Sequence, residues 1–407
     1  MKRLLALNLY YAPESFGGAT IVAEQTVQRL QREHGWSVLV VTTMRDLGLP
    51  PYFLRRYRSG DVNVIAINLP EESFGEKAYR DPEVARCVVE IAASFRPDVC
   101  HSHSIQQMGC EFVDELRRQG VKLAVTAHDC WWLCERQFMI NGDGYYCNQW
   151  QIDARQCRQC VVDARDLERR DAYLRGQLGK MDLVLFPSEF HRQLHLANGI
   201  DAASSQVNKN GVVLPAPDYR DKRARQRASR QQTVFGFVGG PGAIKGADLI
   251  VQAFNSIERV DYELQVVDAA RNIGASWTDA GYWQVPGEMS FSPPYQQDTM
   301  DDYFAGIDVL LFPSQWKESF GLTVREALAR DVWVIATDAG GVSEDLDDGV
   351  NATIIPFGSG VAELRQAIEQ ALDFGRWQAY TNPFSDKIRG FDEQARELSG
   401  SLRALLA

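Results

Sequence analysis

The sequence predicts an α/β protein made of two doubly wound, Rossmann-like domains. Three observations support this prediction. Short apolar strands alternate with helical stretches through most of the 407 residues, a polar basic run interrupts the alternation near the middle, and one strand-to-loop segment occurs in similar form on both sides of that run. Continuous apolar strands that alternate with helices are typical of parallel sheets covered on both faces. The length suits two domains.

Eleven strands are expected, each a short β-rich apolar run, with helical segments between most of them. The strands before the basic run are Leu4–Leu9, Ser37–Thr42, Val62–Asn68, Asp98–Ser102, Lys122–Ala127 and Asp182–Pro187. The strands after it are Val234–Val238, Tyr262–Val267, Asp308–Pro313, Val332–Thr337 and Ala352–Pro356.

The basic run, Arg220–Gln232, separates two halves of similar size. A run of charges is typical of a solvated face or a linker, and we interpret this run in that way. The expected domains are therefore residues 1–215 and 216–390, with a cysteine-rich insertion at 130–160 in the first. The last segment, 391–407, is expected to form a helix, and packing of this helix on the first domain is one option.

The net charge is −11, from 54 acidic and 43 basic residues. Because nucleic-acid binding requires a basic face, no nucleic-acid partner is expected. No apolar run reaches the roughly 18 residues that predict a transmembrane helix. The first residues, MKRLLALNLYYAPESFGG, resemble the start of a signal peptide, but their apolar stretch is short and continues into a glycine loop. We therefore interpret them as the first strand and expect a cytoplasmic protein.

Two segments of similar sequence end strands in the two halves. DLVLFPSEF (Asp182–Phe190) and DVLLFPSQW (Asp308–Trp316) each combine a buried strand, Pro-Ser and an aromatic residue. The serine can cap the turn or helix that follows. The loop would lie at the carboxyl edge of a parallel sheet, where open α/β sheets bind ligands. Two such edges facing each other would form a cleft between the domains.

Two glutamates lie close together in KESFGLTVREALARD. Glu318 falls in the loop after a strand, and Glu326 falls about one turn into the next helix. Backbone amides at the start of a helix lack intrahelical partners and can bind an anion. The amides concerned belong to Ser319, Phe320, Gly321 and Leu322. A diphosphate between two polyols would fit this arrangement, and the alternative is a surface helix with an ordinary glutamate at each end.

Two glycine-rich turns connect strands to helices. In VFGFVGGPGAIKGADLIVQAF, Gly239 and Gly240 end a strand and Lys245 opens a helix. Lys245 would supply a positive charge for phosphate beside the helix N-terminus. The segment is neither a P-loop nor a GxGxxG fingerprint, and a simple tight turn is the alternative. In the N-terminal half, Gly17 and Gly18 form a second such turn before an amphipathic helix.

Together these segments resemble the retaining glycosyltransferases of family 4, which have the GT-B fold and a Glu-x7-Glu motif. The resemblance covers nearly the whole chain in the right order. Its further matches are Pro13, HSHS at His101–Ser104, TAHD at Thr126–Asp129, NGV at Asn210–Val212 and TDAGGVSEDL at Thr337–Leu346. It implies two Rossmann-like domains facing across a cleft, with 1–215 binding the acceptor and 216–390 binding the nucleotide sugar.

The resemblance implies a role for each matching residue. Glu326 would hold the ribose of a nucleotide sugar. Glu318 and the amides of Ser319–Leu322 would hold the transferred sugar and the phosphates. Lys245 would neutralise the diphosphate leaving group, and His128 would face the transferred sugar. The expected catalytic residues are therefore Glu318, Lys245 and His128.

The resemblance also implies roles for further residues. Gly17 and Gly18 would admit the diphosphate and the acceptor. A purely structural histidine is the alternative for His128, and a structural role is the expected one for His101 and His103. Many family members carry arginine where this chain has Gly240, so a cation on the diphosphate is missing or comes from elsewhere, and the part played by that loop stays open.

These groups predict a retaining transfer that requires no metal ion or other cofactor. No pair of carboxylates is placed as nucleophile and acid, so we expect front-face substitution, in which a leaving phosphate oxygen helps to deprotonate the acceptor hydroxyl. The one Asp-x-Asp match, Asp345-Leu346-Asp347, falls at an expected helix end.

The expected reaction moves a sugar from a UDP- or GDP-sugar to a growing glycan or lipid-linked acceptor. The resemblance implies cell-surface polysaccharide synthesis, such as lipopolysaccharide O-antigen or capsule. The alternatives are a catalytically silent sugar-nucleotide-binding protein and a nicotinamide-dependent oxidoreductase, which also uses doubly wound sheets.

Five of the eight cysteines lie between residues 130 and 160. Cys134, Cys147, Cys157 and Cys160 form a C-x12-C-x9-C-x2-C pattern. Four thiols can complete a tetrahedral, structural zinc site, and some family 4 sequences look similar in carrying such an insertion. Free or buried thiols, disulfides and a sulfur-ligated iron cluster are the alternatives. Cys130 could also replace one ligand.

The segment Leu47–Gly60 mixes aromatic residues with Arg55, Arg56 and Arg58. This composition could contact a membrane surface or a lipid-linked pyrophosphate acceptor. An ordinary exposed loop is the alternative. Peripheral contact with the inner face of the cytoplasmic membrane is therefore one option for the location of the protein.

Overall fold

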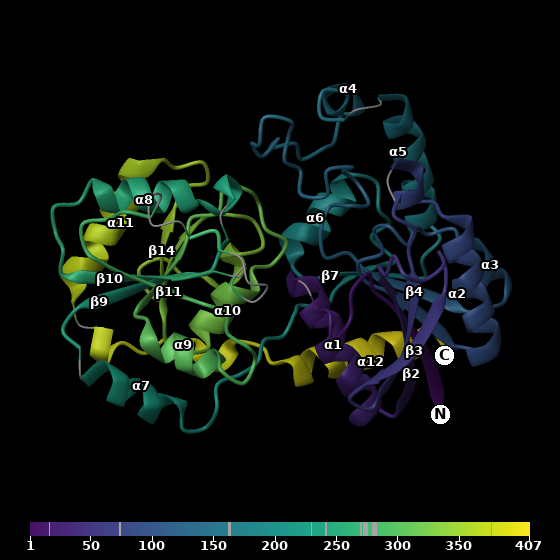
Figure 1. Cartoon of the computed structure of the whole chain (residues 1–407), viewed down its shortest axis with the longest axis horizontal. Helices are drawn as coiled ribbons and strands as arrows, with labels where there is room; N and C mark the ends of the chain where they lie inside the picture. The colour runs from purple at the N-terminus through teal and green to yellow at the C-terminus, as the bar shows by residue number, and fades with distance from the viewer. Residues whose placement is uncertain are drawn as a thin grey trace. The chain divides into compact units, whose positions relative to one another are not determined.

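The structure is a computed structural model that describes residues 1–15, 17–72, 75–161, 164–228, 230–240, 242–268, 271, 276–278, 283–375 and 377–407. These residues divide into two compact units (Figure 1). Unit 1 contains 1–142, 147–211 and 391–407, and unit 2 contains 143–146 and 212–390. Each unit is organised around a sheet of its own.

In the described part of the chain, unit 1 has an eight-stranded sheet in the order β3-β4-β2-β1-β5-β6-β7-β8. Neighbouring strands pair in parallel, except that β3 pairs antiparallel with β4. The strands are β1 (Lys2–Leu7), β2 (Trp36–Met44), β3 (Leu54–Ser59), β4 (Val62–Asn68), β5 (Val99–Ser102), β6 (Lys122–Thr126), β7 (Leu183–Phe186) and β8 (Ser205–Val207).

Helices cover both faces of this sheet. They are α1 (Gly17–Arg32), α2 (Pro82–Phe95), α3 (Phe112–Arg118), α4 (Ala154–Cys157), α5 (Ala164–Leu178), α6 (Glu189–Ala197) and α12 (Phe391–Ala404). Alternate side chains of β1 enter different cores, as the two-residue period of a strand requires. Leu5 and Leu7 pack in one core with residues of α2, α3 and α5, and Leu4 packs in the other with residues of α1 and α12.

The chain's last helix, α12, belongs to unit 1. The Trp36 indole, which is 1% exposed, donates a hydrogen bond to the Ser399 hydroxyl over 2.9 Å. Arg29 of α1 forms an ion pair with Asp392 at 2.5 Å. Leu402 of α12 is fully buried against the sheet. Residues from both ends of the sequence therefore complete one core.

Unit 2 has a six-stranded parallel sheet within the described residues, in the order β11-β10-β9-β12-β13-β14. Its strands are β9 (Thr233–Phe237), β10 (Tyr262–Val267), β11 (Glu288–Ser292), β12 (Val309–Phe312), β13 (Trp333–Thr337) and β14 (Ala352–Ile355). Its helices are α7 (Tyr219–Ala228), α8 (Ala247–Asn255), α9 (Met300–Gly306), α10 (Leu322–Leu328) and α11 (Val361–Phe374). Two hydrophobic cores enclose the sheet, one on each face.

Every expected strand is present, with bounds that differ by at most two residues. Three strands were not expected: β3, β8 and β11. All three lie at the edge of a sheet, and none is a continuous apolar run. The alternative of an ordinary exposed loop for Leu47–Gly60 does not hold for its second half, where Leu54–Ser59 pairs with β4.

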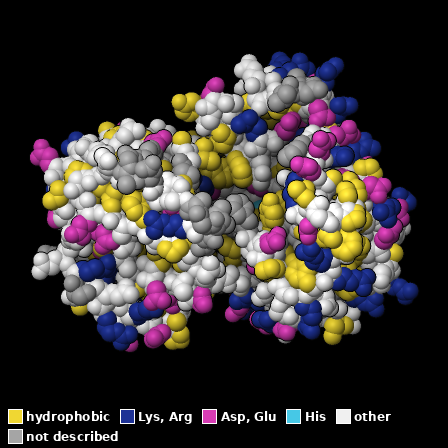
Figure 2. All heavy atoms as spheres, viewed as in Figure 1, with side chains coloured by type: hydrophobic (Ala, Val, Ile, Leu, Met, Phe, Trp, Pro, Cys, Tyr) yellow, Lys and Arg dark blue, Asp and Glu magenta, His cyan; other side chains and the backbone are white. Residues whose placement is uncertain are grey.

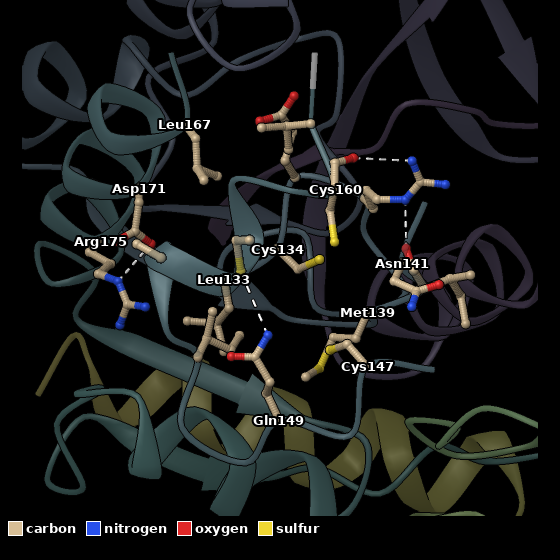
Figure 3. A pocket seen from close by; sticks show the side chains of 17 residues that line it. Leu133, Cys134, Met139, Asn141, Cys147, Gln149, Cys160, Leu167, Asp171 and Arg175 are labelled. Carbon is tan, nitrogen blue, oxygen red and sulfur yellow. Dashed lines mark hydrogen bonds and ion pairs between the residues drawn. The ribbon is translucent and has the colours of Figure 1, made fainter. Parts of the chain in front are cut away.

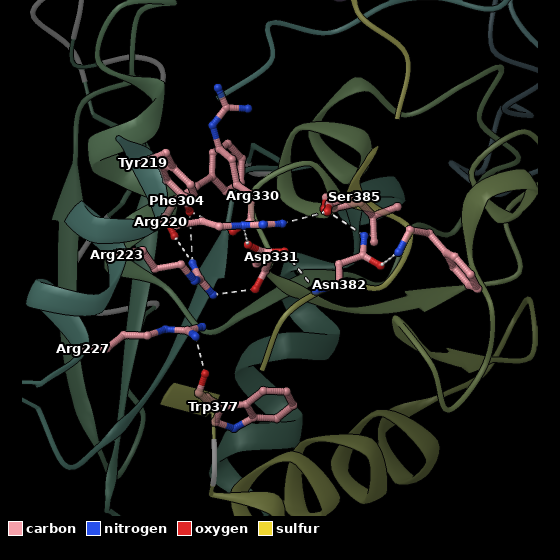
Figure 4. Close-up of polar contacts among 12 residues, drawn as sticks. Tyr219, Arg220, Arg223, Arg227, Phe304, Arg330, Asp331, Trp377, Asn382 and Ser385 are labelled. Atoms are coloured by element: carbon pink, nitrogen blue, oxygen red, sulfur yellow. Dashed lines mark hydrogen bonds and ion pairs between the residues drawn. The ribbon is translucent and has the colours of Figure 1, made fainter. Parts of the chain in front are cut away.

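The interpretation of Arg220–Gln232 as a solvated face or a linker is right only in part, because most of the run lies in α7, a helix with one exposed face and one buried face (Figure 4). Arg223 is 4% exposed and donates to the carbonyls of Phe304 and Asp331, each at 2.7 Å. Arg227 is 3% exposed and forms an ion pair with Asp308 at 2.9 Å. Buried guanidinium groups need such partners, and these partners lie far along the chain from the basic run.

The predicted capping of the Pro-Ser segments is confirmed in one copy. Ser188 accepts a hydrogen bond from the amide of His191 at 3.1 Å and caps α6. Ser314 instead donates to the carbonyl of Trp316 at 3.1 Å and the carboxylate of Glu318 at 3.2 Å. The second copy thus orients a predicted site residue.

The visible surface shows Lys and Arg side chains interspersed with Asp and Glu side chains (Figure 2). No basic face of the kind that nucleic-acid binding requires is evident in this view. None of the helices in the described residues has both the length and the apolar character that crossing a membrane requires.

Candidate active site

The predicted donor residues of unit 2 gather at the carboxyl edge of its sheet. The adjacent strands β9, β12 and β13 are each followed there by a loop that contains a predicted motif. From β9 the chain first adds β10 on one side and later β12 on the other, so the strand order reverses between β9 and β12. Ligands of open α/β sheets bind at such a switch point.

Glycines let the first two loops touch. Gly246 has a φ of +78°, and a Cβ there would lie 2.3 Å from the carbonyl oxygen of Pro313. The amide of Gln315 donates to the carbonyl of Ile244 at 2.7 Å. Gly239 packs against Phe237 so closely that a Cβ would lie 2.4 Å from the ring, whereas Gly240 has a φ of +77° and open space around it. Gly240 therefore leaves room for a ligand.

Lys245 and Glu318 form an ion pair at this edge. The ammonium nitrogen lies 2.6 Å from Oε1 of Glu318, which also accepts the Ser314 hydroxyl. Glu318 is only 7% exposed. Its backbone forms a parallel bridge with Gly340, so the loop after β13 fixes its position. Two groups that the sequence assigns to different parts of a ligand therefore contact each other directly.

Glu326 lies in α10 and is 8% exposed. Its Oε2 accepts a hydrogen bond from the hydroxyl of Tyr295 at 2.9 Å. Burial raises the pKa of Glu326 above the ordinary value for a glutamate, against the effect of that hydrogen bond. Tyr295 belongs to no motif that the sequence revealed.

The start of α10 has the conformation that its glycine predicts. Gly321 has a φ of +84°, and a Cβ there would lie 2.8 Å from a methyl carbon of Val342. Arg325, 2% exposed, pairs with Asp345 at 2.6 Å and donates to the carbonyl of Gly341 at 2.7 Å. The arginine thereby ties α10 to the loop after β13. The helix itself is short, with seven residues.

Unit 1 has a switch point of its own, between β1 and β5. Asn8, at the end of β1, is buried and its side-chain oxygen accepts the amide of Ser104 at 3.0 Å. Gly17 begins α1 with a φ of +79° and open space around the position of a Cβ, and Gly18 follows it in the helix.

Three histidines lie at the same edge of unit 1. Nδ1 of His103 is 3.0 Å from Nε2 of His128, and Nε2 of His101 is 2.8 Å from the hydroxyl of Thr126. Burial lowers the pKa of His128 to about 4 and that of His101 to about 3. The imidazoles are therefore neutral near pH 7. The contact of His103 with His128 was not predicted from the sequence. The motifs HSHS and TAHD lie at the ends of the neighbouring strands β5 and β6, and this placement could have indicated it.

Family models account for both units. The model of "Glycosyltransferase Family 4" matches residues 16–214, and that of "Glycosyl transferases group 1" matches residues 218–381. The chain belongs to the family 4 glycosyltransferases. The predicted family is thereby confirmed.

Curated relatives of this glycosyltransferase match its sequence over shorter stretches. A D-inositol 3-phosphate glycosyltransferase of Mycobacterium leprae is 29% identical over 189 residues, which cover 44% of this chain and 43% of the relative. A lipopolysaccharide 1,2-N-acetylglucosaminetransferase of Salmonella typhimurium is 29% identical over 195 residues, which cover 41% of this chain and 47% of the relative. The chain thus spans less than half the length of either relative.

Solved structures match the glycosyltransferase over nearly its whole length. WaaG, a glycosyltransferase involved in lipopolysaccharide biosynthesis, has a TM-score of 0.67 and 15% identity, with 98% of this chain and 99% of that chain covered. Alr3699/HepE of Anabaena in complex with UDP has a TM-score of 0.65 and 18% identity, with coverage of 99% and 100%. These likenesses confirm the predicted fold class, GT-B.

The predicted cysteine ligands of this glycosyltransferase line one cavity (Figure 3). Cys134, Cys147, Cys157 and Cys160 are all free thiols, half-buried around it. Within the described ranges, no three His, Cys, Asp or Glu side chains are arranged to hold a metal ion. The four thiols therefore share a cavity without a preset ligand geometry.

Proposed function

We propose that the protein is a retaining glycosyltransferase that moves a sugar from a nucleotide sugar to a growing glycan or lipid-linked acceptor. The observation that carries this proposal is the Lys245–Glu318 pair at the switch point of unit 2. A buried carboxylate and a partly exposed ammonium are the groups that a sugar hydroxyl and a diphosphate require at one place.

Unit 2 would bind the donor. Glu326 would accept hydrogen bonds from the ribose, and Tyr295 would orient its carboxylate. Gly240 and the Ser319–Leu322 backbone would admit the diphosphate, with Gly239 shaping the turn. A UDP- or GDP-sugar is the proposed donor, and the complexes of Alr3699/HepE with UDP and with UDP-glucose support the first of these.

Transfer would proceed by front-face substitution. The acceptor hydroxyl oxygen bonds to the anomeric carbon while the bond from that carbon to the diphosphate oxygen breaks. The hydroxyl proton passes to the departing phosphate oxygen, so the products are the glycosylated acceptor and a nucleoside diphosphate. Lys245 would stabilise the charge that develops on the phosphate, and Glu318 would hold the sugar.

We infer that this transfer needs no metal ion. The one Asp-x-Asp match begins at Asp345, whose carboxylate is held by Arg325 at 2.6 Å. Arg325 is almost fully buried, so releasing Asp345 to a metal would leave its guanidinium without its carboxylate. Activity should persist in EDTA, and a requirement for added Mg²⁺ or Mn²⁺ would contradict this inference.

Unit 1 would bind the acceptor, with Gly17 and Gly18 at its carboxyl edge and His128 toward the transferred sugar. Cell-surface polysaccharide, such as O-antigen or capsule, is the proposed product class. The names of WaaG and the Salmonella relative, both tied to lipopolysaccharide, support it. A cytoplasmic location with peripheral contact at the inner membrane face would suit a lipid-linked acceptor.

Thermal unfolding with UDP, GDP, ADP, CMP or dTDP tests the donor site first, because a ligand that binds the native state raises Tm. A shift with one nucleotide selects the sugars for a turnover assay. Lys245→Met should abolish the shift. Lys222→Met is the matched control, because Lys222 pairs with Asp302 elsewhere in unit 2. No shift with any nucleotide would contradict the proposal, and binding without turnover would indicate a catalytically silent protein.

A further inference from the structure

The segment between β6 and α5 contains little regular structure. In its described residues, 127–161, α4 is the one helix and it has four residues. Loops of this length without their own elements are uncommon in compact domains. Its outer part buries little apolar surface, since Tyr145 is 73% exposed and Trp150 is 46% exposed. Some other interaction must therefore hold it together.

Four thiols from three parts of this segment surround one cavity of about 40 Å³. Cys157 ends α4, and the amide of Cys160 donates to its carbonyl at 2.9 Å, which forms a tight Cys-x2-Cys turn. Cys134 follows another turn, and the amide of Cys147 donates to the carbonyl of Met139 at 2.8 Å. The space suits an ion or a few water molecules and is too small for a sugar.

The other cysteines differ from this set. Cys87, Cys100 and Cys110 are at most 2% exposed and pack in the hydrophobic core of unit 1. Their thiols act as small apolar groups. The four cavity thiols are instead half-buried and contribute little to a core. Packing therefore does not explain why four cysteines converge on one cavity.

Charged groups of both signs lie at the cavity, whose lining includes Glu135 and Asp171 as well as Arg136 and Arg175. Arg170 is 3% exposed and donates to the carbonyl of Trp131 at 2.5 Å, and no carboxylate of the described chain forms an ion pair with it. Arg136 donates to the carbonyls of Ile140 at 2.5 Å and Cys160 at 3.3 Å. Arg136 is exposed, whereas the buried Arg170 has the carboxylates of Glu135 and Asp171 in its electrostatic surroundings. A thiolate centre would add negative charge near this guanidinium.

We propose that Cys134, Cys147, Cys157 and Cys160 bind one zinc ion in a closed, structural site. Binding releases four thiol protons and leaves a tetrahedral thiolate centre of charge −2 beside Arg136 and Arg170. Because no three of these described side chains are arranged to hold a metal ion, binding requires the thiols to move toward one another. The binding free energy then contributes to the folding of a segment that has little core of its own.

The same site supports a residue of the proposed acceptor side. The amide of Gln137 donates to the carbonyl of Cys134 at 2.9 Å, and its side chain donates to the carboxylate of Asp129 at 2.6 Å. Asp129 is adjacent to His128 in the chain. Zinc would therefore fix the turn that holds this carboxylate. The metal proposal itself does not rest on the proposed glycosyl transfer.

Elemental analysis of the purified full-length chain, freed of any affinity tag, tests the proposal. We expect one zinc per chain, and replacement by Co²⁺ should give the visible absorption of tetrahedral thiolate coordination. Cys134→Ala and Cys157→Ala should each lose the metal. Cys130→Ala and Cys87→Ala are matched controls that should keep it, because neither thiol lines the cavity.

Thiol titration keeps the test valid when a variant folds poorly. In the wild-type protein, a mercurial reagent should release zinc in step with the modification of four thiols. Absence of metal with four thiols that react at once would overturn the proposal. A molecular mass reduced by disulfide formation, or bound iron in place of zinc, would also overturn it. The proposal would fail as well if Cys130→Ala lost the metal while Cys134→Ala kept it.

Discussion

Substitutions at the ion pair of Lys245 and Glu318 can separate its contribution to folding stability from its contribution to ligand binding. The two atoms are 2.6 Å apart, with side chains 29% and 10% exposed. At an effective dielectric constant of about 20, two unit charges at this distance attract by about 6 kcal/mol, and desolvation offsets most of that. Removing both partners should cost less than the sum of the two single losses, because each single loss includes leaving one charge without its partner.

The perturbation is a double-mutant cycle of Lys245→Met and Glu318→Gln. Lys245→Met leaves a carboxylate that is 7% exposed, so we expect a loss of about 2–4 kcal/mol in the free energy of unfolding. Glu318→Gln leaves an ammonium that can reach water, so the loss should be about 1–2 kcal/mol. The double variant should be more stable than the sum of the single losses predicts, by about 1–2 kcal/mol.

Urea unfolding and nucleotide titration of all four proteins measure the cycle. The double variant should lose less stability than the sum of the single losses but show no such compensation in nucleotide affinity or turnover, and we expect its kcat to fall about 10²–10³-fold. Single losses that add to within about 0.3 kcal/mol would refute the coupling. Wild-type turnover in the double variant would refute the assignment of this pair to the donor site.

Three further outcomes can be measured. Gly246→Ala should lower the free energy of unfolding by more than about 2 kcal/mol, because its Cβ would meet a carbonyl oxygen at 2.3 Å, while Gly240→Ala should cost about 1 kcal/mol. Tyr295→Phe should cost about 0.5–1.5 kcal/mol in urea unfolding and weaken nucleotide binding in calorimetry. Burial lowers the pKa of His128 to about 4 and of His101 to about 3, so the unfolded chain binds more protons below about pH 6.5. Stability should therefore fall as pH drops from about 6.5 to about 4, by up to about 1.4 kcal/mol per pH unit for each histidine, and unchanged urea midpoints over that range would contradict it.

Strands in the middle of the sheets could be predicted because both of their faces are buried and their sequences are continuously apolar. Edge strands such as β3 and β11 lack that signal, since partners cover them on one side only. The burial of Arg223 and Arg227 within the basic run was missed, because a charged residue in a sequence does not reveal whether it is buried. Arg223 is buried by carbonyls from residues 304 to 331, and only the fold brings them to α7.

In the candidate site too, features that depend on neighbouring residues could be predicted, whereas contacts between distant residues could not. Glycine turns and the spacing of Glu318 and Glu326 identified the loops of unit 2, because such local patterns depend on neighbouring residues. The direct contact of Glu318 with Lys245, and of Glu326 with Tyr295, joins residues 73 and 31 positions apart. A single sequence does not show which residues far apart in the chain contact each other in the fold.

The position of α12 has a consequence for the order of folding during synthesis. Most of unit 2 is one uninterrupted stretch, 212–390, which is synthesised before α12. The first half of unit 1 must wait, because Trp36 is covered by a helix whose Ser399 lies 363 residues later. Domains generally fold as units, with the N-terminal one first. Here one face of unit 1 is completed only after the residues of unit 2 have been synthesised, and a nascent chain exposes that face until α12 has been made.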